Sequence, residues 1–242
     1  TFTQAKSVIV IGADSDSSRN IHGIDLTVLA DERQTVQRLN QLALTKYPAD
    51  NFAERRSWAH QQAAKFRDEQ ISIAQKVKAQ TSTIRPWKVV ETLDSELEHL
   101  GGGLVMMEQF ALPLEGIVGS SENRNNIYIW PAGGSEGYGI GATLGLKLAA
   151  PDRPVVGVIG DGSLYYADSG LWTAAHHGVP ILYLIANNQA YGIVAGAFGE
   201  AGGNMSDTGE YAGVVLDGID PVKIADGFGV DGMRVDDESC LG

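Results

Sequence analysis

The stretch VVGVIGDGSLYY, residues 155–166, passes from an apolar segment directly into Gly-Asp-Gly. An apolar run bounded by glycine is typical of a strand that is buried on both faces of a parallel sheet. Asp161 then follows this strand at its carboxyl end. The dinucleotide-binding fingerprint requires Gly-x-Gly-x-x-Gly, but Tyr165 stands where the third glycine should be. A carboxylate here would also repel a phosphate group unless a positive centre lay between them.

A second polar segment follows the next apolar run. Residues 181–186 read ILYLIA, and two asparagines follow them. Asp161 and Asn188 lie 27 residues apart, about the length of one strand-helix-strand unit, and the carboxyl ends of parallel strands line the ligand crevice. The backbone carbonyl of Ala190 lies two residues beyond Asn188. Three hard oxygen ligands with room for water and phosphate suit Mg²⁺, so the sequence predicts a magnesium site that in turn binds an anion.

The remaining pattern predicts an α/β protein in three parts. From residue 84 onward, apolar segments bounded by Gly or Pro alternate with amphipathic ones, which predicts a parallel sheet with helices on both faces. Residues 1–45 contain two apolar runs and a helical pattern, as expected of part of an α/β domain. Residues 46–83 are charged and rich in Ala and Gln, which indicates a linker helix. The binding domain, residues 84–242, is expected to be incomplete at its C-terminal end.

The composition limits the possible partners. The net charge of −12 argues against nucleic acid or an anionic membrane as a partner, and an anionic ligand would need a local positive centre. The lone Cys240 excludes a disulfide within the chain and fits a reducing compartment. No apolar run approaches the roughly 18 residues of a membrane span, and the N-terminus lacks the layout of a signal peptide. We therefore expect a cytoplasmic protein.

Gly160-Asp161-Gly162 followed by Asn187-Asn188 resembles the cofactor-binding motif of the thiamine-diphosphate-dependent enzymes. The flanking segments 133–163 and 171–192 resemble the diphosphate-binding domain of the 2-oxo acid decarboxylase and acetolactate synthase group. Within that group, the motifs most closely resemble those of benzoylformate decarboxylases. The resemblance covers about residues 84 to 235, and residues 1–45 resemble, more weakly, the end of the family's central domain.

The resemblance implies a set of cofactor-binding residues. Asp161 and Asn188 would ligate Mg²⁺ by their side chains and Ala190 by its carbonyl. The backbone N–H groups of Gly162 and Ser163 would bind the diphosphate. The carbonyl of Gly134 would accept from the 4′-amino group of the aminopyrimidine, and Tyr166 would contact the cofactor. The family bends the cofactor into a V, so that C2 of its thiazolium ring attacks a 2-oxo acid and the ring accepts electrons during decarboxylation.

The chain departs from the family pattern at two places. The family has Leu, Ile or Met under the cofactor where this chain has Glu136. Glu136 is thus a candidate catalytic and cofactor-contacting carboxylate, or else its side chain turns to solvent, and the sequence leaves both alternatives open. Hydroxyl residues that benzoylformate decarboxylases carry after a strand are replaced by Gln109, Phe110 and Ala111, which cannot make the same phosphate contacts.

The resemblance implies a thiamine-diphosphate- and Mg²⁺-dependent enzyme that decarboxylates a small 2-oxo acid without oxidation. The alternatives are a carboligase of the acetolactate synthase type and a cofactor-binding protein that has lost catalysis. In the family, a glutamate of the pyrimidine-binding domain of a neighbouring subunit protonates the cofactor. We therefore expect a homodimer or homotetramer, and we expect these 242 residues to be inactive alone.

Overall fold

The computed structural model describes residues 6–14, 22–47, 52–76, 83–108, 125–131 and 135–241. The chain divides into two compact units, Thr1–Ala64 and Lys65–Gly242, which are described here one at a time.

The first unit contains a parallel strand pair followed by a helix. Strands β1 (Ile9–Gly12) and β2 (Leu26–Leu29) pair in parallel. Helix α1 (Glu32–Lys46) begins after Asp31, whose carboxylate accepts a hydrogen bond from the backbone N–H of Gln34 at 2.8 Å. An acidic N-cap of this kind satisfies one of the unpaired N–H groups of the first turn. The apolar runs and helical spacing of residues 1–45 thus correspond to these three elements.

A long helix follows within the segment where the sequence indicates a linker. Helix α2 spans Ala53–Lys76, and it crosses the boundary between the two units. It is rich in charged and amide side chains. Among the helices of the described residues, neither α2 nor any other is long and apolar enough to cross a membrane.

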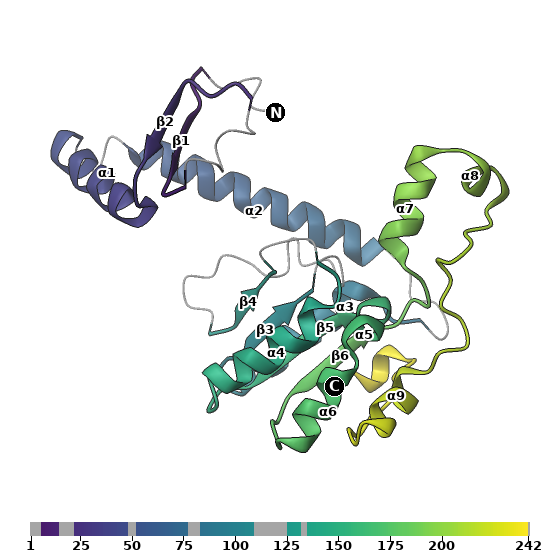
Figure 1. Cartoon of the computed structure of the whole chain (residues 1–242). Coiled ribbons are helices and arrows are strands. Elements are labelled where there is room, and N and C mark those ends of the chain that lie inside the picture. Colours follow the sequence, from purple (N-terminus) through teal and green to yellow (C-terminus); the bar gives the residue numbers. More distant parts are fainter. Residues whose placement is uncertain are drawn as a thin grey trace. The chain divides into compact units, whose positions relative to one another are not determined.

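The second unit is built on a four-stranded parallel sheet, as the sequence predicts (Figure 1). The strand order is β4-β3-β5-β6, and all three pairings are parallel. The strands are β3 (Leu104–Met107), β4 (Ile127–Ile129), β5 (Val155–Gly160) and β6 (Leu182–Ala186). Because β5 pairs with β6 up to Gly160 and Ala186, the residues that follow these two strands emerge side by side.

One helix covers the first face of this sheet. Helix α3 (Pro86–His99) begins with a proline at its first position, where the missing N–H costs nothing. Its buried side chains Val90, Leu93 and Leu97 form one core cluster with alternate residues of β3 and β5. The strand residues are Val105, Met107, Val156 and Val158. The two-residue period of a strand places them on one face.

Four further helices contribute side chains to a second core cluster, on the other face of the sheet. They are α4 (Tyr138–Ala149), α5 (Asp161–Ala167), α6 (Ser169–His176) and α9 (Pro221–Gly227). Their side chains form a second cluster with Ile159, Tyr183 and Ile185 of the sheet. The helix residues include Ile140, Leu164, Leu171 and Ile224. Figure 1 shows α4 and α6 in front of the strands and α3 behind them, so the predicted helices flank the sheet on both sides.

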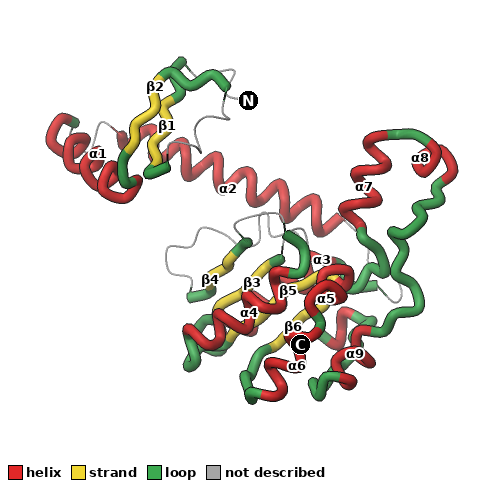
Figure 2. The backbone as a smooth tube through the Cα atoms, in the orientation of Figure 1, coloured by secondary structure: helices red, strands yellow, loops and turns green. Residues whose placement is uncertain are grey.

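Between β6 and α9 the chain makes a helical excursion, shown in red and green in Figure 2. It contains α7 (Gly192–Ala201) and α8 (Asn204–Thr208). The two ends of the excursion pair with each other: the N–H of Tyr191 donates to the carbonyl of Val214 at 2.9 Å, and the N–H of Leu216 donates to the carbonyl of Gln189 at 2.8 Å. This pairing holds the segment that follows β6 in place.

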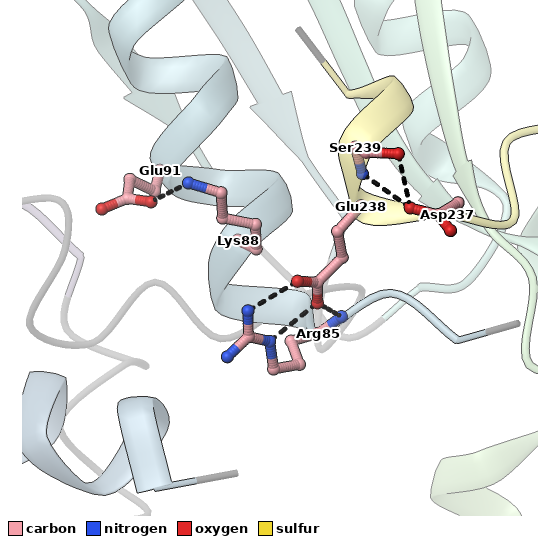
Figure 3. A network of polar contacts seen from close by, with 6 residues as sticks. All are labelled: Arg85, Lys88, Glu91, Asp237, Glu238 and Ser239. Carbon is pink, nitrogen blue, oxygen red and sulfur yellow. Dashed lines mark hydrogen bonds and ion pairs between the residues drawn. The ribbon is translucent and has the colours of Figure 1, made fainter. Parts of the chain in front are cut away.

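The last described segment returns to the start of α3 (Figure 3). A short 3₁₀ helix, η2 (Glu238–Cys240), contains a glutamate whose carboxylate accepts from the guanidinium of Arg85 at 2.7 and 2.5 Å. The same carboxylate also accepts from the backbone N–H of Arg85 at 2.8 Å. Arg85 and Glu238 thereby join the start of α3 to the last described segment of the second unit.

Candidate functional site

Asp161 is the first residue of α5, directly after β5, and its side chain is 2% exposed. Its carboxylate accepts a hydrogen bond from the backbone N–H of Gln189 at 2.9 Å. Gln189 follows Asn188 in the segment after β6. The structure therefore brings the Gly-Asp-Gly turn and the double-asparagine turn into contact, and the contact is made by a backbone group rather than by the asparagine side chains.

Burial dominates the electrostatics of Asp161. It raises the pKa of this carboxyl, and the N–H groups of Gly162 and Gln189 offset only part of that effect. A cation next to the carboxylate would stabilise its charged form and lower the pKa again. This position therefore stays a predicted cation ligand.

The other predicted ligands lie in the turn after β6. The side-chain oxygen of Asn188 accepts from the N–H of Ala190 at 3.0 Å, and Gln189 between them has a left-handed backbone with φ of 57°. Such a φ is uncommon outside glycine. Ala190 forms an isolated bridge with Val215. The hydrogen bonds of this bridge are made by the carbonyl of Gln189 and the N–H of Tyr191. Since successive residues of an extended segment point in opposite directions, the carbonyl of Ala190 lies on the side away from that pairing.

This donor set is not a cluster of carboxylates. Among the described residues, no group of three or more His, Cys, Asp or Glu side chains is arranged to hold a metal ion. The predicted set of one carboxylate, one amide oxygen and one carbonyl would leave coordination positions for water and phosphate, and oxygen ligands of this kind suit Mg²⁺.

An aromatic pair covers the first turn of α5. Gly162 lies so close to Tyr191 that a Cβ atom at position 162 would be 2.6 Å from two carbon atoms of the ring. The ring of Tyr191 stacks on that of Tyr166, with centroids 5.8 Å apart and planes 16° apart. Burial, followed by the hydrogen bond with Tyr166, raises the pKa of Tyr191. The predicted cofactor residues Gly162 and Tyr166 therefore share one neighbour, Tyr191, which the sequence did not single out.

Glu136 lies in the turn before α4, and it contacts α5. The hydroxyl of Ser163 donates to the Glu136 carboxylate at 2.7 Å. The Glu136 side chain is exposed in this chain, whereas Ser163 is buried. Next in the turn, Gly137 has φ of 85°, and a Cβ there would lie 2.7 Å from the Cβ of Tyr166. The turn thus packs against α5, and it directs Glu136 toward a predicted cofactor residue.

A second buried carboxyl lies beside this turn and was missed by the sequence analysis. Glu108 follows β3 directly, and it is only 1% exposed. Its carboxylate accepts from the backbone N–H of Gly137 at 2.5 Å, and burial raises its pKa. The signal was available: an acidic residue directly after an apolar strand is the same pattern that identified Asp161.

Some predicted residues lie outside the described part of the chain. They are Gly134, the predicted acceptor for the 4′-amino group, and Gln109, Phe110 and Ala111, which replace hydroxyl residues of the family.

This chain is similar to several known proteins. Residues 117–241 match the family model described as thiamine pyrophosphate enzyme, C-terminal TPP binding domain. The chain is 37% identical over 107 residues to benzoylformate decarboxylase of Pseudomonas aeruginosa, covering 44% of this chain and 19% of that protein. It is 26% identical over 237 residues to the acetolactate synthase isozyme 3 large subunit of Escherichia coli, covering 95% of this chain and 38% of that protein.

A solved structure is also similar. The thiamine diphosphate-dependent 4-hydroxybenzoylformate decarboxylase of Rhodococcus jostii RHA1 superposes with a TM-score of 0.56 at 30% sequence identity, covering 68% of this chain and 30% of that one. The chain thus spans well under half the length of these relatives. The family match includes β5, β6 and the turns that follow them, and the chain therefore belongs to the thiamine pyrophosphate enzyme family, with residues 117–241 matching its C-terminal TPP binding domain.

Proposed function

We propose that this chain supplies the diphosphate- and Mg²⁺-binding part of an enzyme that decarboxylates a 2-oxo acid without oxidation. The observation that carries the proposal is the contact between Asp161 and the N–H of Gln189. It joins the Gly-Asp-Gly turn to the double-asparagine turn beside a buried carboxyl whose raised pKa a cation would lower. The similarity to two decarboxylases acting on aryl 2-oxo acids supports the same reaction class.

In this proposal the chain's own groups bind and orient the cofactor. Asp161, Asn188 and the carbonyl of Ala190 hold Mg²⁺, and the N–H groups of Gly162 and Ser163 face the diphosphate. First-turn N–H groups have no partner within the helix, which suits them to bind an anion. Tyr166 contacts the cofactor. When bound, the cofactor supplies an electron-accepting thiazolium ring for cleavage of the bond next to a carbonyl.

Acetolactate-synthase-type carboligation is the second candidate. The Escherichia coli acetolactate synthase subunit aligns with 95% of this chain, including the first unit. Both reactions begin with attack on a 2-oxo acid, and they differ in what reacts next. Product analysis over a panel of 2-oxo acids separates the two: release of an aldehyde supports the decarboxylase, and formation of a new carbon–carbon bond supports the carboligase. A protein that binds the cofactor but forms neither product has lost catalysis.

We also propose that the whole protein is a homodimer or homotetramer, in which a pyrimidine-binding domain of a neighbouring subunit completes the site. The exposed apolar residues of α7, Ile193, Val194 and Phe198, are consistent with such an assembly. The single cysteine is consistent with a reducing, cytoplasmic setting.

The central test is Asp161→Ala in the protein at its full natural length. We expect loss of Mg²⁺-dependent thiamine diphosphate binding by calorimetry, because the variant removes the only charged ligand of the proposed ion. The fold should persist, since Asp161 lies at a strand end rather than among the apolar side chains of the core. Asp168→Ala, which changes an acidic residue at the other end of α5, is the matched control and should bind normally. Unchanged affinity in Asp161→Ala would remove the proposal.

A further inference from the structure

The buried carboxyl of Glu108 has no counterpart in the cofactor contacts proposed above. Glu108 is 1% exposed, and one carboxylate oxygen, Oε2, has no hydrogen-bond partner among the described residues. Burying a carboxyl without full hydrogen bonding costs free energy. Glu is almost never fully buried unless it is paired, so an acid at this position calls for a role beyond packing.

The contacts of Glu108 point to the start of α4. Its Oε1 accepts from the N–H of Gly137, the N-cap residue of that helix. Its Oε2 lies beside Gly139, where a Cβ atom would be 2.9 Å away, so the missing side chain makes room for the carboxylate. A negative charge at this end of a helix is favourable, because it interacts with unpaired N–H groups and the helix dipole.

The turn that Glu108 holds also touches two predicted cofactor residues. Glu136 accepts from the hydroxyl of Ser163, and Gly137 packs against Tyr166 closely enough to exclude any side chain. Gly137 has a left-handed φ of 85°, so the turn has a defined conformation that one hydrogen bond to its backbone can select. A shift of the turn would displace Glu136 relative to Ser163.

We propose that Glu108 is a positioning residue that, through the N–H of Gly137, sets the 135–137 turn against α5 and so fixes where Glu136 and Ser163 face the cofactor. This inference rests on the function proposed above, since it takes Ser163 as a cofactor-binding residue. It assigns the buried carboxyl a role in cofactor affinity rather than in stability alone.

The test compares three substitutions at position 108 in the full-length protein. Glu108→Ala removes the acceptor, and Glu108→Asp withdraws it by one methylene while keeping the charge. Glu108→Gln keeps an acceptor oxygen for Gly137. Because a hydrogen bond to a charged group contributes about 1.5–3 kcal/mol, we expect thiamine diphosphate affinity to fall about tenfold to a hundredfold in the first two variants. In Glu108→Gln the fall should be clearly smaller than in these two variants, since the acceptor oxygen is retained and only its charge is removed.

The matched control is Asp94→Ala. Asp94 is another buried carboxyl of the same unit, and it belongs to α3. It accepts hydrogen bonds from the side chains of Asn126 and Tyr128, which belong to neither α4 nor α5. It should lower the midpoint of thermal unfolding and leave cofactor affinity unchanged at a temperature where the variant is folded. If Glu108→Ala does not fold, Glu108→Asp carries the test.

The outcomes are distinct. Affinity that is unchanged in both Glu108→Ala and Glu108→Asp, or lost equally in Glu108→Gln, would overturn the positioning role and leave the proposed function intact. Failure of the unchanged protein to bind thiamine diphosphate with Mg²⁺ would overturn the proposed function and this inference with it. Loss of affinity in Asp94→Ala equal to that in Glu108→Ala would reduce Glu108 to a stabilising residue.

Discussion

At the scale of single residues, two buried carboxyl groups follow neighbouring strands of the sheet. Asp161 follows β5 and Glu108 follows β3, and burial raises the pKa of both. Each receives backbone N–H groups, from Gln189 and from Gly137 respectively. The two acids nonetheless face different tasks: the first lies beside oxygen groups suited to a cation, and the second lies at the start of a helix. The groups around each carboxyl, rather than its residue type, distinguish the proposed metal ligand from the proposed positioning residue.

Glu136→Leu tests the residue that departs most from the family pattern. If Glu136 lies under the thiazolium ring, its carboxylate stabilises the ring's positive charge and opposes the step in which the ring accepts electrons. Leucine would restore an apolar support, and we expect the decarboxylation rate at saturating cofactor to rise severalfold, as about 1 kcal/mol of transition-state energy gives. The rate of 2-oxo acid consumption in the full-length protein measures this.

Glu136→Gln is the control for that substitution, because it removes the charge and keeps the shape. A rise in both variants identifies the charge as the cause, and a rise in Glu136→Leu alone identifies the apolar support. A rate that is equal or lower in Glu136→Leu, with cofactor affinity unchanged, would mean that the carboxylate serves the native reaction.

At the scale of elements, the parts of the site that the sequence predicts are those carried by strand ends. Apolar runs and glycines in the sequence indicate where the two strands end. They therefore predict that Asp161 and Asn188 follow neighbouring strands with a helix between them. The element β4, by contrast, has only three residues and no period to detect. Contacts between the first turns of α4 and α5 were also not predictable, because they depend on how two helices approach each other. Two further contacts join segments that are distant in the sequence: Tyr191, after β6, lies over Gly162 of α5, and Glu108, after β3, accepts from the N–H of Gly137 before α4.

Gly162→Ala tests the fit between α5 and the segment after β6. The added methyl group would lie 2.6 Å from the ring of Tyr191, so the ring and its stacking partner must move. Overpacking of this kind typically costs about 1–3 kcal/mol of the free energy of unfolding, and we expect thiamine diphosphate affinity to fall as well. Thermal unfolding and calorimetry measure the two effects.

Gly141→Ala is the matched control, because a Cβ at that helical position meets no atom within 4 Å. It should leave cofactor affinity unchanged and stabilise the fold slightly, since alanine is favoured over glycine within a helix by roughly 0.5–1 kcal/mol. Normal stability of Gly162→Ala would show that Tyr191 does not rest on the first turn of α5.

At the scale of the whole molecule, the folded second unit begins before the family match does. The match starts at residue 117, whereas α3 and β3 precede it and supply five of the seven buried residues of one core cluster. The pair of Arg85 and Glu238, separated by 153 residues, joins the start of α3 to the last described segment of this unit. No spacing rule identifies such a pair among 18 basic and 30 acidic residues, so only the folded chain reveals it.

The Arg85–Glu238 pair leads to a prediction for acid stability. Hydrogen bonds from the Arg85 side chain and backbone lower the pKa of Glu238 from its ordinary 4.5 to about 2. Because the folded protein then binds fewer protons than the unfolded chain, the pair's contribution is fully present above pH 4.5 and is lost as the pH falls toward 2. In urea unfolding, Glu238→Gln should be less stable than the unchanged protein at neutral pH, and the difference should shrink between those two pH values.

Asp236→Asn is the control, since the pair of Arg234 with Asp236 in the same segment is exposed on both sides, and an exposed pair contributes little. A difference between Glu238→Gln and the unchanged protein that stays constant down to pH 2 would show that the contribution of Glu238 does not depend on its charge.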